Sequence, residues 1–151
     1  MNFTTLKKVC LLLTVLFLLS PAIRTVRAAE TTPNPVLILV GIEPFETGGK
    51  QFIRYKYEVF NFDQFPNDLF AASPQLPPCG KNTKAARTWV DIYTQSGQRL
   101  NGFCAFGSNK DLRQIWFAME PGVVPPSWVY IELTDRQTNT KYKSNLAETS
   151  M

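Results

Sequence analysis

The sequence predicts an all-β domain, an antiparallel β-sandwich of about seven strands with a long disulfide-tethered loop before its central hairpin. Short stretches rich in β-branched and aromatic residues recur along the chain, and Gly, Pro, Asn and Ser turn signals separate them. Strands in this number and spacing are typical of two packed antiparallel sheets. The chain has no internal repeat and no convincing amphipathic helix, so neither a repeat fold nor a helical fold is favoured.

Residues 1–28 have the pattern of a secretory signal peptide. Lys7 and Lys8 precede the apolar run Val9–Leu19, and the small-residue pattern Val26-Arg27-Ala28 follows it. This run is too short for a transmembrane helix, which needs about 20 apolar residues. We therefore expect cleavage after Ala28, no integral membrane span in the mature chain, and a secreted or periplasmic location. An uncleaved anchor is the alternative.

Removal of the signal peptide changes the charge of the chain. Four of the 16 basic residues lie within residues 1–28, whereas all 12 acidic residues follow them, so the formal charge falls from +4 to zero. A phosphate-binding surface needs clustered Lys and Arg. The mature chain therefore gives no support for nucleic acid as a partner.

Two cysteines, Cys79 and Cys104, remain after signal cleavage. An even pair without metal-ligand spacing in an oxidising compartment predicts a disulfide, whose loop closure is worth about 3 kcal/mol. The chain has no histidine, which removes the usual general base and both the Ser-His-Asp and Cys-His arrangements. We therefore expect a protein that is not an enzyme and needs no cofactor.

The predicted domain covers residues 36–146, between a flexible leader at 29–35 and a frayed tail at 147–151. Its clearest strand lies within residues 52–62, where apolar and charged residues alternate so that one face turns to the core and the other to water. The seven expected strands lie at residues 36–42, 52–62, 87–94, 99–106, within 111–119, and at 128–134 and 141–146.

A long segment, residues 61–84, separates the second and third expected strands. Its prolines remove backbone donors and exclude a central strand. A short helical turn capped by Asn67 fits residues 67–72. Apolar side chains within the segment would be costly to expose as a group, so we expect them to pack. These side chains are Phe62, Phe65, Leu69, Phe70 and Leu76.

The turn signal Gln95-Ser96-Gly97-Gln98 predicts a hairpin between the third and fourth strands. Directly opposed residues share a face, and both faces of this hairpin are apolar. We expect one face to pack into the core and the disulfide to draw the proline-bearing loop over the face that holds Trp89. The expected pairs are Trp89 with Cys104, Asp91 with Gly102, and Tyr93 with Leu100.

At the level of strand pattern, the chain resembles fibronectin type III and other immunoglobulin-like domains. The resemblance rests on the strand around Trp89 and on the closing segment WVYIELTDRQTNTKYKSN, which is similar to the last two strands of such a domain. It implies a β-sandwich over most of the mature chain. The cysteine pair departs from the immunoglobulin pattern, because both cysteines lie around one hairpin. No functional residues are carried over from these domains.

Aromatic side chains and the proline loop supply the candidate ligand contacts. Trp116, Trp128 and Tyr130 are the best candidates for a sugar-stacking platform, to which Trp89 and Tyr93 are possible additions, whereas packing in the core is the alternative for any aromatic residue. The loop Leu76-Pro77-Pro78-Cys79-Gly80 is a candidate for insertion into a protease cleft, with a structural tether as the alternative.

Acidic residues suggest two further sites. Asp63, Asn67 and Asp68 are oxygen donors of the kind that calcium prefers, although turn and cap formation are the ordinary roles of these residue types. A glycosidase needs two carboxylates at a defined separation in a cleft. The acids nearest to aromatic residues are Asp91, Glu132 and Asp135.

Taken together, these patterns predict a secreted, non-catalytic binding or adhesion module that recognises a protein or carbohydrate partner outside the cytoplasm. The alternative is a protease-inhibitor-like domain that acts through the loop at residues 74–80.

Overall fold

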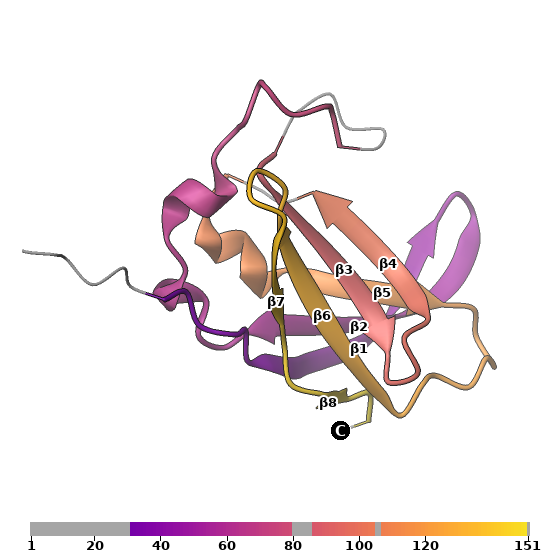
Figure 1. Cartoon of the computed structure of the whole chain (residues 1–151). Helices are drawn as coiled ribbons and strands as arrows, with labels where there is room; N and C mark the ends of the chain where they lie inside the picture. The colour runs from indigo at the N-terminus through magenta and orange to yellow at the C-terminus, as the bar shows by residue number, and fades with distance from the viewer. Residues whose placement is uncertain (1–30, 80–85, 105–106, 151) are drawn as a thin grey trace, which may run out of the picture. The chain divides into compact units, whose positions relative to one another are not determined.

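Two antiparallel sheets form the fold (Figure 1). The computed structural model describes residues 31–79, 86–104 and 107–150, so the predicted signal peptide lies outside the described residues. Within these ranges, three short 3₁₀ helices and no α-helix accompany the strands. The strands are β1 (Leu37–Thr47), β2 (Lys50–Val59), β3 (Thr88–Thr94), β4 (Arg99–Cys104), β5 (Ile115–Met119), β6 (Trp128–Asp135), β7 (Thr140–Lys143) and β8 (Ala147–Glu148), and the 3₁₀ helices are η1 (Phe62–Gln64), η2 (Asn67–Phe70) and η3 (Asn109–Arg113).

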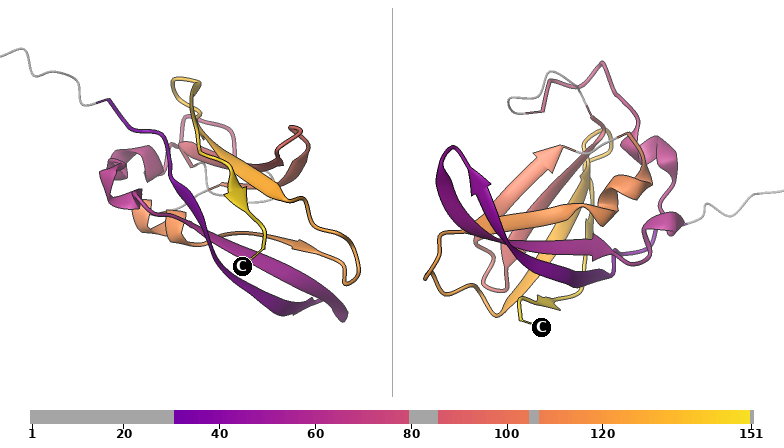
Figure 2. Two further views of the ribbon diagram at one scale, coloured as in Figure 1. Left: turned by 90° about the horizontal axis from the view of Figure 1, so that it is seen from below. Right: turned by 180° about the vertical axis from the view of Figure 1, so that it is seen from behind.

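The smaller sheet has three strands in the order β1-β2-β5. The larger sheet has five strands in the order β4-β3-β6-β7, with β8 paired to the first half of β6. Figure 1 shows the larger sheet in front of the smaller one, with the strands of the two layers crossing, and Figure 2 shows the same layers from below and from behind. The predicted antiparallel β-sandwich is therefore confirmed.

Buried apolar residues alternate with outward-facing residues along the strands, and the buried ones form the core between the two sheets. In β2, Tyr55, Tyr57 and Val59 are buried, and the residues between them face outward. The rings of Tyr55 and Phe117 stack with centroids 4.9 Å apart. Each fully buried large apolar side chain contributes about 1.5–3 kcal/mol. The larger sheet contributes Val90, Ile92, Val129, Ile131 and Leu133 to this core.

The long segment after β2 packs as expected. Phe65, Leu69 and Phe70 are buried in the core cluster, and the hydroxyl of Thr88 donates to the carbonyl of Leu69. The helical turn is present as η2 but begins after Pro66, so Asn67 is not its cap. The side chain of Asn67 instead accepts a hydrogen bond from the backbone N–H of Asn109, the first residue of η3.

The central hairpin confirms most of the expected register. Trp89 lies opposite Cys104, and Asp91 lies opposite Gly102. The pairing of Tyr93 with Leu100 is wrong, because a bulge in β4 places Tyr93 opposite Arg99. The extra residue of a bulge moves one side chain out of the alternation. Leu100 accordingly packs against the core.

The Cys79–Cys104 disulfide is present, with the two Cα atoms 5.9 Å apart. Because Val90 and Ile92 are buried, the opposite face of the hairpin, which holds Trp89, is the solvent side. The described part of the proline-bearing loop, up to Cys79, does not lie over that face; residues 74–79 rise at the end of the sheet near the β6–β7 turn (Figure 1). The disulfide therefore ties the loop to the edge strand β4 without making it a cover.

Within the expected frayed tail at residues 147–151, two residues pair with the larger sheet as β8. Ala147 pairs with Val129 in β6, and Glu148 pairs with Trp128. Thr149 is buried and donates its backbone N–H to the carbonyl of Ser127 at 3.2 Å. The pairing of Ala147 and this hydrogen bond hold residues 147–149 beside the start of β6, which the polar composition of the segment does not indicate.

Candidate functional site

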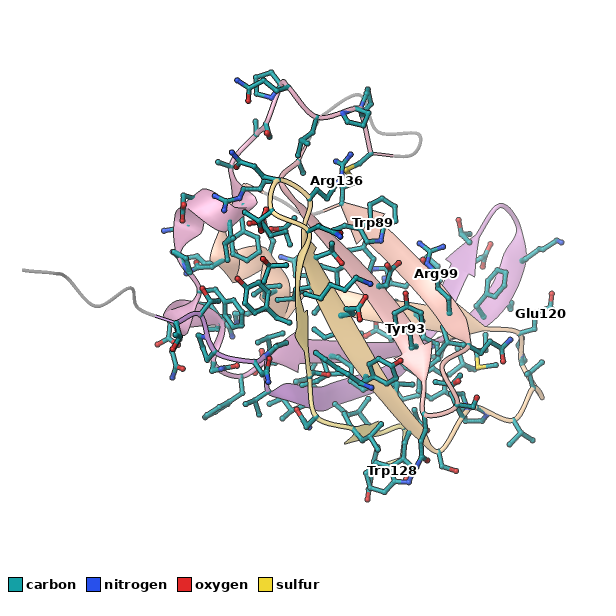
Figure 3. The ribbon with its side chains drawn as sticks, in the orientation of Figure 1. Trp89, Tyr93, Arg99, Glu120, Trp128 and Arg136 are labelled. Atoms are coloured by element: carbon teal, nitrogen blue, oxygen red, sulfur yellow. A yellow bond between two sulfur atoms is a disulfide. The ribbon has the colours of Figure 1, made fainter. Side chains whose placement is uncertain are left out.

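The solvent side of the larger sheet carries ordered rows of aromatic and charged side chains, and we call it the outer face. Alternation along β3 and β6 turns these residues away from the core. Figure 3 shows Trp89, Arg99 and Tyr93 following one another along the hairpin on this side. The members of the outer face are Trp89, Asp91, Tyr93, Arg99, Tyr130, Glu132, Lys141 and Lys143.

An ion pair crosses the hairpin between neighbouring strands. Arg99 Nε donates to Asp91 Oδ1 at 2.6 Å, and the Arg99 guanidinium also lies over the Trp89 ring, 5.6 Å from its centroid. The pair lies in the space above Gly102, where a Cβ atom would overlap both charged groups. The lack of a side chain at Gly102 leaves room for the guanidinium and the carboxylate to lie across the strand.

Stacked rings occupy the middle of the outer face. Tyr93 and Tyr130 stack with centroids 5.3 Å apart and an interplanar angle of 22°. Lys143 Nζ lies 4.0 Å from the centroid of Tyr130. The pKa of Tyr93 is raised, first by desolvation and then by the nearby charges of Asp91 and Glu132. The Tyr93 hydroxyl donates to Asp91 Oδ2 at 3.5 Å.

The three acids considered for catalysis do not gather at one place. Asp91 and Glu132 lie opposite each other on the outer face, each with its own cation: Glu132 accepts from Lys141 Nζ at 2.7 Å, and this hydrogen bond is the main cause of the raised pKa of Lys141. Asp135 points inward and is 3% exposed. Arg87 donates to both of its oxygens, at 2.9 and 2.7 Å.

The three predicted platform residues lie at three different positions. Tyr130 belongs to the outer face, and Trp128 lies at the start of the same strand on the same side. Trp116 lies on the other sheet, in β5, where its ring contacts Phe45 and the Arg54 guanidinium at 5.5 and 5.7 Å. Since the outward faces of the two sheets point away from each other, Trp116 cannot share one flat ligand with the other two residues.

A hollow of about 330 Å³ lies beside Trp128, between the β3–β4 turn and the connection from β5 to β6. Trp128 is 37% exposed, and Figure 3 shows it at the end of the larger sheet. We call this place the Trp128 hollow. Its lining residues are Thr94, Gln95, Ser96, Pro126, Ser127 and Trp128.

Arg136 holds the proline loop at the opposite end of the sheet. Its guanidinium donates to the carbonyl of Pro77 at 2.8 Å and to that of Ala86 at 2.9 Å, and lies 2.7 Å from Cys79 Sγ. Pro77 and Pro78 are exposed. Gly80, the last residue of the candidate inhibitory loop, lies outside the described residues.

The loop acids serve as structural partners. Asp68 pairs with Arg87 at 3.1 Å, and Asn67 accepts from Asn109. In the described ranges, no group of three or more acids, cysteines or histidines is placed to hold a metal ion. The same part of the chain contains no helix long and apolar enough to cross a membrane.

Several residues of the outer face were not singled out from the sequence. The contact of Lys143 with Tyr130 depends on the β6–β7 register. Arg99 reaches Asp91 because of the β4 bulge, which no turn or proline signal marks. The one available signal was Gly102 in mid-strand, since glycine in a strand often marks a close approach of another group.

Comparison with known proteins adds no relative to this description. The chain matches no family model, and neither the curated proteins nor the solved structures contain a significant match. What the structure defines is the class, a disulfide-bearing antiparallel β-sandwich with an aromatic and ionic outer face.

Proposed function

We propose that this protein is a secreted, non-catalytic binding module whose outer face contacts a protein or glycan partner. The proposal rests on one observation: stacked rings and ion pairs form a continuous array over β4, β3, β6 and β7 on the side away from the core. Tyr, Trp and Arg are the residues that dominate binding energy at interfaces. An array fixed before binding loses little conformational entropy when the partner arrives.

The disulfide supports the extracellular part of the proposal, since such bonds persist in oxidising compartments. The strand pattern supports a relation to fibronectin type III and immunoglobulin-like domains. Fold similarity says little about activity, so the binding function is argued from the outer face. The lack of histidine and the separate cations on Asp91 and Glu132 support a module without catalysis.

Arrays of glycans and of secreted or cell-surface proteins test this function. Labelled parent protein is compared with the double variant Tyr93→Ala and Tyr130→Ala and with Trp116→Ala, an aromatic control on the other sheet. We expect features bound by the parent to be lost in the double variant and retained in the control. Circular dichroism establishes that each variant is folded. Binding that survives the double variant, or no bound feature on either array, would overturn the proposal.

A second candidate function is protease inhibition through the loop at residues 74–80. It is favoured by the exposed Pro77 and Pro78 on a segment fixed by the disulfide and by Arg136. Inhibition assays against serine and cysteine proteases test it. A role of this kind predicts inhibition that is lost in Pro78→Gly and retained in the Tyr93 and Tyr130 variant.

A further inference from the structure

We infer that the Trp128 hollow binds one pyranose ring of an uncharged glycan. This inference rests on the proposed function and deepens it, because it names the ligand class and a subsite at the end of the outer face. It is carried by an uncovered indole ring, a rim of neutral hydroxyl and amide groups, and a fixed backbone beneath them.

The indole of Trp128 differs from the other two tryptophans. Trp89 lies under the Arg99 guanidinium, and Trp116 contacts Phe45. Among the described residues, the Trp128 ring stacks on no other ring and lies under no cation, and it is 37% exposed. The electron-rich face of an indole attracts polarised C–H groups, of which a pyranose ring presents several on one side.

The rim of the hollow has the hydrogen-bonding character of a sugar site. Ser96 and Ser127 offer hydroxyls and Gln95 offers an amide, and no charged side chain lines the hollow. Hydroxyl and amide groups both donate and accept, as sugar hydroxyls do. The volume of about 330 Å³ is at the small end of the range for ligand sites, which suits one ring better than a folded surface.

Hydrogen bonds from three parts of the chain hold the hollow in shape. The backbone N–H of Gln95 donates to the carbonyl of Trp128 at 3.1 Å, which ties the β3–β4 turn to β6. Thr149 donates to the carbonyls of Ser127 and Pro126 through its backbone N–H and its hydroxyl. Since both walls are fixed before binding, little entropy remains to be lost.

An acidic glycan and a proline-rich peptide fit the hollow less well. The cations Arg99 and Lys141 of the outer face are already paired with carboxylates and do not line the hollow. A proline-rich peptide docks in a groove between several aromatic side chains. Trp128 is the one aromatic residue among those that line the hollow, and Tyr93 and Tyr130 stack on each other outside it.

Isothermal titration calorimetry of the protein tests the inference. The probes are cellohexaose, xylohexaose, mannohexaose and chitohexaose as neutral glycans, hexagalacturonate as an acidic glycan, and hexaproline as a peptide. We expect at least one neutral probe to bind and its affinity to fall about tenfold or more in Trp128→Ala. Trp128→Phe, which keeps a ring, should lose less. Trp116→Ala is the matched control and should bind as the parent does.

Two further readouts identify the ligand class. Affinity for the neutral probe should be the same in about 0.05 M and about 0.5 M salt, because no charge lines the hollow. Tryptophan emission should change on binding in the parent and not in Trp128→Phe. Binding of hexaproline alone, salt-sensitive binding of hexagalacturonate alone, or no binding of any probe would overturn the inference.

This experiment separates the inference from the proposed function. One result is that no neutral glycan binds, while the arrays show a partner that the Tyr93 and Tyr130 variant no longer binds. The inference about the hollow is then wrong, and the proposed binding role of the outer face is supported. The opposite result is that Trp128→Ala abolishes glycan binding, while the Tyr93 and Tyr130 variant binds as the parent does. The proposed role of the outer face is then wrong, and the glycan site in the hollow is supported.

Discussion

Replacement of Asp135 by asparagine tests how the sheet that carries the outer face is held together. Asp135 lies at the end of β6, is 3% exposed and accepts two hydrogen bonds from Arg87. The backbone N–H of Gln137 and the hydroxyl of Thr138 also donate to it, at 3.0 and 2.8 Å. One carboxylate therefore fixes the start of β3 and the β6–β7 turn.

The pKa of Asp135 gives the size of the effect. The hydrogen bond from Arg87 is the main reason that this pKa falls from 3.8 to about 2, against the opposing effect of burial. A pKa unit corresponds to about 1.4 kcal/mol, so the charged form is stabilised by about 2 kcal/mol relative to the unfolded chain. Asp135→Asn also leaves the Arg87 charge without its main partner. We expect the free energy of unfolding to fall by about 2–4 kcal/mol at neutral pH.

The pH dependence has a definite sign. Because the pKa in the folded state lies below that in the unfolded state, the carboxylate stabilises the fold above about pH 4, and this contribution is lost as the pH falls toward 2. Urea unfolding of parent and Asp135→Asn at several pH values measures it. The difference between their free energies of unfolding should shrink by about 2 kcal/mol between about pH 5 and pH 2.

A matched control separates this buried pair from an exposed one. Glu132→Gln removes the pair with Lys141, whose side chain is 55% exposed, and should cost less than about 1 kcal/mol. Two results would refute this role of Asp135 in holding the start of β3 and the β6–β7 turn. One is a loss of unfolding free energy in Asp135→Asn no larger than in Glu132→Gln. The other is a difference between Asp135→Asn and the parent that does not change with pH.

Three further predictions concern the disulfide, the outer face and the hollow. Replacing Cys79 and Cys104 together by serine should lower the free energy of unfolding by about 3 kcal/mol in urea titrations, and an unchanged midpoint would contradict this. Gly102→Ala should displace the end of the Arg99 side chain and so weaken binding of the protein to the features of the arrays. The free energy of unfolding should change by less than about 1 kcal/mol. Unchanged binding would contradict a role of the Arg99–Asp91 pair in binding. Thr149→Val should speed amide exchange around Trp128, because it removes the hydroxyl that donates to the carbonyl of Pro126, and equal exchange rates would contradict the account of the fixed hollow.

The fold could be predicted from the sequence because its strands are marked by alternation. The segment around Tyr55 and the hairpin around the Ser96-Gly97 turn show the period of two and the turn residues that fix strand and register. The bulge in β4 could not be predicted, because one extra residue changes the face of Leu100 without changing composition. The strand β8 was missed because two paired residues give no periodic signal.

The candidate site could be predicted only in part. Trp128 and Tyr130 alternate with the buried Val129 and Ile131 in β6, so the sequence pattern indicates the outward face on which they lie. The sequence does not show which strands belong to the same sheet, and so it does not show which outward faces form one surface. Trp116 lies in β5 of the smaller sheet, on the opposite side of the sandwich. Contacts of Arg99 and Lys143 with rings depend on cross-strand register, which alternation within a single strand does not contain.

The most direct test of the binding role is to map the contact surface of a ligand found on the arrays. Backbone amide chemical shifts of the labelled protein are recorded with and without that ligand. The account predicts that the shifted amides lie in β3, β4, β6 and β7 and reach the Trp128 hollow. Shifts confined to β1, β2 and β5, or to the loop around Pro77, would contradict it.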